Sequence, residues 1–145
     1  MNEDLNWAFV DVEDVLHLHA TAIRQHGGDQ SLAPKAGCVE GSIGSAVTAS
    51  MYVAEDGEPD LLVAVAYLLV YLAKNHCFVD GNKRVAWSAF LRVLDVNGIR
   101  IVAKQDEAAK LVNDVASGVI DAHGILIWLS SPDRITAAPG WADTT

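Results

Sequence analysis

The stretch that decides the fold comprises residues 76–84 and reads His76-Cys77-Phe78-Val79-Asp80-Gly81-Asn82-Lys83-Arg84. This polar segment lies between two apolar ones, 61–73 and 85–96. Apolar residues at three- and four-residue spacing predict that the second of these is a helix, which the polar stretch would open. Unpaired backbone N–H groups and a positive dipole at a helix start attract anions. The sequence therefore predicts a site here and not a piece of core.

The length and composition of the chain are typical of a single domain with one core, because it has 145 residues and 51% of them are hydrophobic. A net charge of −9 argues against binding of nucleic acid, which draws on clustered basic residues. Four of the ten basic residues nonetheless lie close together in sequence, at Lys74, Lys83, Arg84 and Arg92. This local positive charge favours a small phosphorylated ligand over a duplex.

The two cysteines, Cys38 and Cys77, form no CxxC motif and have no metal-ligand spacing. Two free thiols in a reducing cytoplasm are the simpler interpretation, and a disulfide is the alternative. No secretion signal is visible at the start of the chain. The apolar segment 61–73 is 13 residues long, shorter than the ~18–20 that a membrane crossing needs. We expect a soluble, cytoplasmic protein without membrane contact.

Periodicity along the rest of the chain predicts an all-helical protein. Helices are expected over 11–26, 39–53, 61–75, 85–96, 106–117 and 121–129, with a short extended stretch over 99–102. The helix over 61–75 is apolar on nearly every face, which predicts burial all round and a central place in the bundle. We expect one domain over 1–131 and a loosely ordered tail over 132–145.

The polar stretch contains the parts of a phosphoryl or nucleotidyl transferase. We expect His76 to end the central helix, with its ring fixed at the floor of a cleft, where it could act as a general base. Asp80 is a lone carboxylate of the kind that can hold Mg²⁺ together with substrate phosphates. Phe78 is expected to point inward and fasten the loop to the core. The remaining polar parts are a glycine that permits positive φ, an amide and two cations, namely Gly81, Asn82, Lys83 and Arg84.

Each of these parts has a simpler interpretation when it is taken alone. A histidine after a helix is usually a helix-end or core residue, Asp80-Gly81 is a turn dipeptide, and Lys83-Arg84 is a solvated helix face. Three further histidines have no partner at metal-ligand spacing and are interpreted as surface or core residues; these are His17, His19 and His26. The concentration of all the polar groups in one loop favours a catalytic site.

The stretch resembles the signature of the Fic/Doc family, H-x-F-x-[D/E/N]-[G/A]-N-x-R. The chain is similar in particular to the Doc (death on curing) branch of bacterial toxin–antitoxin pairs, over roughly residues 9–130. The resemblance implies a Fic-like helical fold that binds ATP and Mg²⁺ at the loop. It implies that His76 activates a target hydroxyl and that Asp80 is the metal ligand. The backbone of Gly81 and the side chains that follow it, those of Asn82, Lys83 and Arg84, are implied to hold the phosphates.

Two departures from the AMP-transferring Fic pattern concern the chemistry. Lys83 replaces a glycine and Trp87 replaces an arginine. Doc-type toxins share the lysine and pass the terminal phosphate of ATP to a threonine of elongation factor Tu, so the resemblance implies a kinase in which Lys83 and Arg84 act beside His76. The alternatives are AMP transfer to a protein hydroxyl and a non-catalytic module that binds an antitoxin.

Self-restraining Fic proteins carry a segment [S/T]-x-x-x-E-[G/N]. Here Ala36 precedes Glu40-Gly41 at that distance, so the segment is absent. The resemblance points instead to a separate antitoxin of the Phd type, which would fold a disordered segment into a groove on this chain. Trp87 and Trp128 are candidates for exposed residues in that groove.

Overall fold

The computed structural model describes residues 6–28 and 33–138. The helices in these residues are α1 (Val12–His26), α2 (Cys38–Val53), α3 (Leu61–Lys74), α4 (Asn82–Val96), α5 (Gln105–Ala116) and α6 (Ala122–Leu129). Two short strands, β1 (Ile99–Ile101) and β2 (Ile135–Ala137), form one antiparallel pair. The expected all-helical architecture is confirmed. No helix among the described residues is long and apolar enough to cross a membrane.

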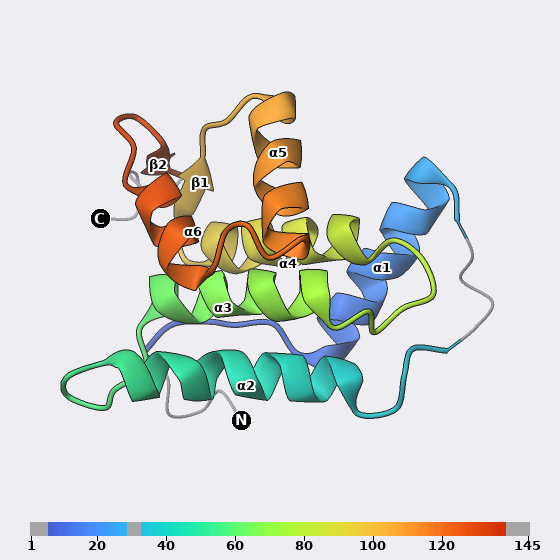
Figure 1. The fold of residues 1–145 in the computed structure, drawn as a ribbon, viewed down its shortest axis with the longest axis horizontal. Helices are drawn as coiled ribbons and strands as arrows, with labels where there is room; N and C mark the ends of the chain where they lie inside the picture. Colours follow the sequence, from blue (N-terminus) through green and yellow to red (C-terminus); the bar gives the residue numbers. More distant parts are fainter. Residues whose placement is uncertain (1–5, 29–32, 139–145) are drawn as a thin grey trace.

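Helix α3 is the centre of the bundle, as its composition predicts. It packs against α2, α4, α5 and α6, and it lies between α2 on one side and α4, α5 and α6 on the other (Figure 1). Asp60 caps it by accepting a hydrogen bond of 3.1 Å from the backbone N–H of Val63. The side chains of α3 that are buried are Ala64, Val65, Ala66, Leu68, Leu69, Leu72 and Ala73. Each leucine buried in this way stabilises the fold by about 1.5–3 kcal/mol.

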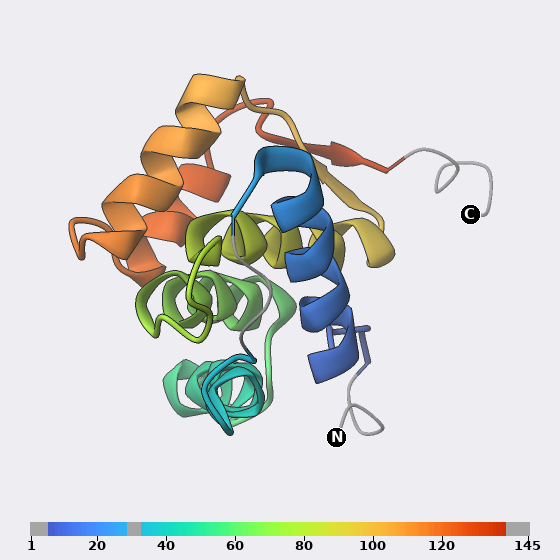
Figure 2. The same cartoon turned by 90° about the vertical axis from the view of Figure 1, so that its right-hand side faces the viewer.

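Helices α1 and α2 lie on different sides of the α3–α4 pair. The view along α2 shows it beneath α3, whereas α1 lies beside α4 (Figure 2). Asp11 and Asp14 form a capping box at the start of α1, and Gly27 ends that helix. Helix α2 begins after Gly37, whose φ is 73°. Just before α2, Lys35 lies against the loop between α3 and α4, where its N–H donates to the carbonyl of Cys77 at 2.8 Å.

The C-terminal part of the chain is more ordered than the sequence suggested. Strand β2 pairs with β1, with Arg100 opposite Thr136, and the N–H of Ala138 donates to Gly98 at 3.0 Å. The expectation of a loose tail over 132–145 is therefore wrong for residues 135–138, because backbone pairing across about 35 residues fixes them in place. The tail beyond residue 138 lies outside the described residues.

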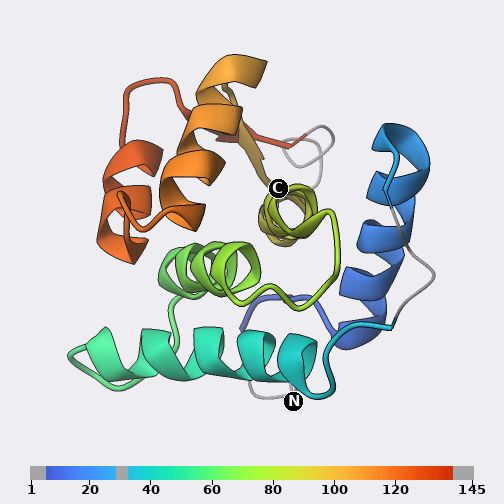
Figure 3. The same cartoon turned by 45° about the vertical axis from the view of Figure 1, so that its right-hand side comes forward.

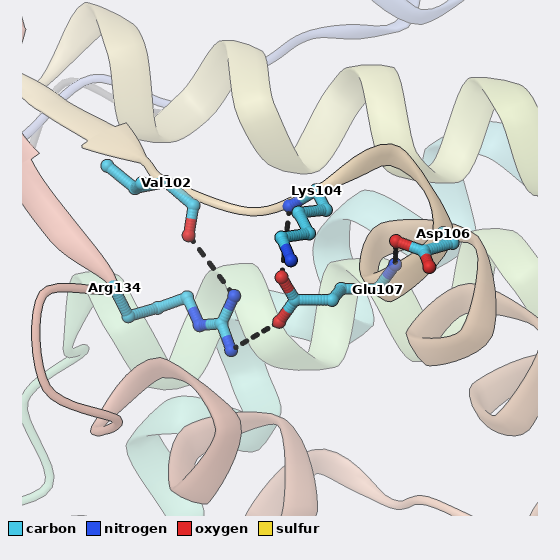
Figure 4. A network of polar contacts seen from close by, with 5 residues as sticks. All are labelled: Val102, Lys104, Asp106, Glu107 and Arg134. Carbon is cyan, nitrogen blue, oxygen red and sulfur yellow. Dashed lines mark hydrogen bonds and ion pairs between the residues drawn. The ribbon is translucent and has the colours of Figure 1, made fainter.

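The start of α5 is fastened by a polar network around Glu107 (Figure 4). Glu107 accepts hydrogen bonds from the backbone N–H of Lys104 at 3.1 Å and from Arg134 at 3.2 Å. Arg134 also donates to the carbonyl of Val102 at 3.1 Å. The N–H of Lys104 is the main cause of a pKa lowered from the usual 4.5 for Glu107, and Arg134 adds to it. The network matters for function because α5 is one wall of the candidate site.

Candidate functional site

The residues 76–84, called the motif loop here, connect α3 to α4 and open the latter (Figure 3). His76 does not end α3, which stops at Lys74 with Asn75 as its cap. The expectation that packing fixes the His76 ring is also wrong, since this side chain is exposed. The backbone turns out of the helix at His76, whose φ is 50°. A positive φ is uncommon in a residue other than glycine, so the surrounding structure has to hold it.

The neighbours of His76 on both sides are tied to the start of α2. Cys77 forms a disulfide with Cys38, and its backbone carbonyl accepts a hydrogen bond of 2.8 Å from the N–H of Lys35. Asn75 donates from its side-chain amide to the hydroxyl of Ser42 at 2.9 Å. The expectation of two free thiols is thus wrong: the fold brings the two Cα atoms to 5.4 Å, a separation that a disulfide spans.

Asn82 closes the motif loop from within. Its side-chain oxygen accepts from the N–H of Phe78 at 3.0 Å, and its amide nitrogen donates to the carbonyl of Phe78 at 2.8 Å. Phe78 points into the core, as expected, and is 5% exposed. The oxygen and the nitrogen of the Asn82 amide thus each make one hydrogen bond that holds the loop.

The opening of α4 leaves several backbone donors without a partner in the helix. Gly81 has a φ of 79°, the conformation expected for it, and no side chain caps the helix. The first hydrogen bond of α4 runs from the N–H of Val85 to the carbonyl of Gly81 at 3.0 Å. The N–H groups of the residues between them, Asn82, Lys83 and Arg84, therefore have no partner within the helix. Unpaired N–H groups beside two cationic side chains are the arrangement that attracts anions.

Two hollows flank the motif loop. The first, called the Trp87 hollow, has a volume of about 590 Å³ and is lined by Arg84, Trp87 and residues of α5 such as Val112. The second, called the His76 hollow, has a volume of about 580 Å³ and is lined by His76, Val79 and Ser117. Both are also lined by the shared residues Asp80, Gly81, Asn82, Lys83 and Asn113. His76 and Arg84 thus lie on either side of one wall, and Asp80 faces both hollows.

The wall between the hollows is completed by a contact that the sequence did not predict. Lys83 donates from its ammonium group to the side-chain oxygen of Asn113 at 3.0 Å, which joins α4 to α5. The Asp80 carboxylate accepts a hydrogen bond from the N–H of Gly81 at 3.1 Å, and it makes no ion pair within the described part of the chain. Asp80 is exposed, so its carboxylate fits the single ligand that Mg²⁺ shares with phosphates. Across residues 6–28 and 33–138, no cluster of three metal-binding side chains offers a competing site.

Histidine 19 contacts the motif loop, a role that the sequence analysis did not predict for it. It is buried on α1, and its Nε2 lies 2.8 Å from the backbone carbonyl of Asp80. Its ring stacks on that of Phe78, with centroids 3.9 Å apart. The spacing of His19 from Val15, Ala22 and Ile23 places it on the apolar face of α1, which was the only available signal. His17 and His26 are exposed, as expected.

The two tryptophans proposed for a partner groove are packed against the core. Trp87 stacks on Phe90 with centroids 5.2 Å apart and meets the edge of Trp128 at 6.2 Å. Arg134 covers Trp128, with its guanidinium carbon 3.9 Å from the ring centroid. Both rings are partly buried against the core, and Trp87 also lines a hollow.

Comparisons with known proteins relate the sequence of this chain to a family and to a curated relative. The model of the Fic/DOC family matches residues 9–94, more than half of the chain, and this range includes the motif loop. The chain is similar to a curated protein named Toxin Doc from Mycolicibacterium smegmatis (strain ATCC 700084 / mc(2)155), with 43% identity over 72 residues. That match covers 48% of this chain and 55% of the relative, so the chain spans about half the length of the curated protein.

Proposed function

This chain belongs to the Fic/Doc family, and on that premise we propose that it is a Doc-like toxin that transfers the terminal phosphate of ATP to a protein hydroxyl. The observation that carries the proposal is Lys83, which stands in the first turn of α4 and whose ammonium is held by Asn113 between the two hollows. A lysine at this place fills space beside the helix opening and adds charge there. It supports a nucleotide pose different from that of AMP transferases, with the terminal phosphate toward the acceptor.

The chemistry needs a base, and His76 is the exposed imidazole of the motif loop. His76 takes the proton of the acceptor hydroxyl, whose oxygen forms a bond to the terminal phosphorus. The bond from that phosphorus to the bridging oxygen breaks, and ADP leaves with the electron pair. Lys83, Arg84 and the free N–H groups of α4 stabilise the charge on the phosphates. Mg²⁺ held by Asp80 would neutralise part of the phosphate charge.

The proposed partners follow from the resemblance. The acceptor is a threonine of elongation factor Tu, and its phosphorylation arrests translation in the cytoplasm. A Phd-type antitoxin restrains the toxin by folding a disordered segment onto it. Other Fic proteins restrain themselves with a segment [S/T]-x-x-x-E-[G/N]. This chain has Ala36 in place of the Ser or Thr before Glu40-Gly41, which supports a separate inhibitor.

The proposal is tested with ATP labelled at the terminal or at the α position. Elongation factor Tu is incubated with the protein and each form, and label is expected on the acceptor from the terminal position only. Label arriving only from the α position would assign AMP transfer instead.

His76→Ala should lower the rate by about 10²–10⁴-fold and relieve growth arrest in cells that lack the antitoxin. His17→Ala is the matched control, because His17 is an exposed histidine of α1 outside both hollows. Unchanged growth arrest with His76→Ala would favour a non-catalytic module.

A further inference from the structure

Histidine 19 is the only ionisable side chain that is buried among the described residues. It is 6% exposed, and the other buried polar side chains are those of Ser42 and Ser50. A buried imidazole needs a hydrogen-bond partner to offset its lost hydration. His19 finds that partner on the motif loop, 61 residues further along the chain, and not on its own helix.

The two contacts of His19 hold the two ends of one short segment. The ring lies almost flat on Phe78, with an angle of 11° between the planes. Its Nε2 donates to the backbone carbonyl of Asp80 at 2.8 Å. A carbonyl can only accept, so the ring nitrogen that faces it carries a proton. Since Asn82 independently holds the backbone of Phe78, the loop is fixed at Phe78 from both α1 and α4, and at Asp80 from α1.

The hydrogen bond to Asp80 bears directly on the direction of the Asp80 carboxylate. The carbonyl of Asp80 and the N–H of Gly81 are the two ends of one planar peptide unit. When His19 fixes the carbonyl, the direction of this N–H is fixed as well. That N–H donates to Oδ1 of the Asp80 side chain at 3.1 Å. The same peptide unit leads into the positive φ of 79° at Gly81, which opens α4.

We propose that His19 is a positioning residue, which orients the Asp80 carboxylate and the opening of α4 through the Asp80–Gly81 peptide. For catalysis this rests on the proposed function, because the carboxylate matters there as the ligand of Mg²⁺. The effect on the loop itself does not depend on any ligand. His19 touches no reacting atom, and it acts through the peptide that it holds.

A pair of substitutions separates the hydrogen bond from the packing. His19→Phe keeps an aromatic ring against Phe78 and removes the donor. His19→Gln keeps an N–H donor at about the reach of Nε2 and removes the ring. The control pair is His17→Phe and His17→Gln, at an exposed site two residues earlier on the same helix.

The first readout is amide hydrogen exchange, measured by NMR without nucleotide or Mg²⁺. We expect His19→Phe to speed exchange at Gly81 on the order of tenfold, because the Asp80 carbonyl loses its partner on α1 and its peptide is free to reorient. His19→Gln should keep most of the protection. Exchange at Ile125, which is buried on α6 away from the loop, should change little and reports global stability.

The second readout is steady-state kinetics of phosphate transfer. His19→Phe should lower kcat on the order of tenfold, with a smaller change in KM for the protein acceptor, and His19→Gln should restore part of the loss. Both His17 variants should match the wild type. If His19→Phe does not fold, the folded His19→Gln variant still decides the matter, because loss of Gly81 protection in it contradicts the proposal.

The outcomes separate this inference from the proposed function. Wild-type exchange at Gly81 and wild-type kcat in His19→Phe overturn the positioning role while phosphate transfer stands. Equal impairment by His19→Phe and His19→Gln also overturns it, since the loss would then not follow the hydrogen-bond donor. If no phosphate is transferred by the wild type but Gly81 shows the expected pattern, the positioning role stands and the kinase assignment fails.

Discussion

The disulfide between Cys38 and Cys77 should contribute a large share of the stability of this protein. It joins residues 39 positions apart, and the bond ties the motif loop to the start of α2. Closing a loop of that length removes entropy from the unfolded chain worth about 4 kcal/mol at 25 °C. Since the whole free energy of unfolding of a domain is about 5–15 kcal/mol, loss of the bond should be easy to measure.

Reduction is the cleanest perturbation, because it leaves both side chains in place. We expect dithiothreitol to lower the free energy of unfolding by about 2–4 kcal/mol in urea titrations followed by circular dichroism. The matched control is the double variant Cys38→Ala/Cys77→Ala, whose urea midpoint should lie below that of the oxidised protein and should not respond to dithiothreitol. Counting thiols in the unfolded, unreduced protein should give none from this pair.

A clear result would refute this reasoning. If two thiols titrate in the unreduced protein and dithiothreitol leaves the urea midpoint unchanged, then hydrogen bonds hold the two segments together without a covalent bond. The contacts of Lys35 with the carbonyls of Asn75 and Cys77, each at 2.8 Å, would then be the tether. In that case Lys35→Met would destabilise the fold in the absence of dithiothreitol by more than the double alanine variant does.

Three further predictions concern the loop and the wall of the site. Asn82→Ala removes both loop-closing hydrogen bonds and should lower the free energy of unfolding by about 1–3 kcal/mol in urea titrations. Lys83→Gly should weaken transfer of the terminal phosphate and raise transfer of AMP, as read by the two labelled forms of ATP; no change in either would contradict the role given to Lys83. The lowered pKa of Glu107 means that its contacts with Lys104 and Arg134 stabilise the folded state fully above pH 4.5 and lose this effect as the pH falls through the lowered value. Glu107→Gln should therefore flatten the fall of the urea midpoint below pH 4.5, and an unchanged acid profile would contradict this.

The sequence predicted what depends on neighbours along the chain. Helix periodicity placed α3 at the centre, and the positive φ of Gly81 follows from local chemistry. The motif loop could be located because its polar residues interrupt two apolar helices. His76 was misplaced because a single cap residue, Asn75, decides where α3 ends, and the apolar pattern carries no information on that.

Contacts between distant residues could not be predicted in the same way. His19 and Asp80 are 61 positions apart, and Lys83 and Asn113 are 30 apart. No spacing rule connects either pair, because the packing of α1 and α5 against α4 brings them together. The cysteine pair presented the same problem, since two cysteines without a motif are compatible with either redox state.

The motif loop contains two kinds of residue, those that hold the loop in place and those that are exposed, and this difference supports a site. Residues of the loop that are buried or doubly bonded, such as Phe78 and Asn82, have their partners within the fold. The exposed ones, His76, Asp80 and Arg84, have no ion-pair partner among the described residues. A loop selected only for stability would not be held from α1, α2 and α5 in order to present unpaired polar groups to two adjoining hollows. A loop that is held in place keeps its exposed polar side chains in fixed positions. Such preorganised groups stabilise a transition state in which charge develops, because they need not reorient when the charge appears.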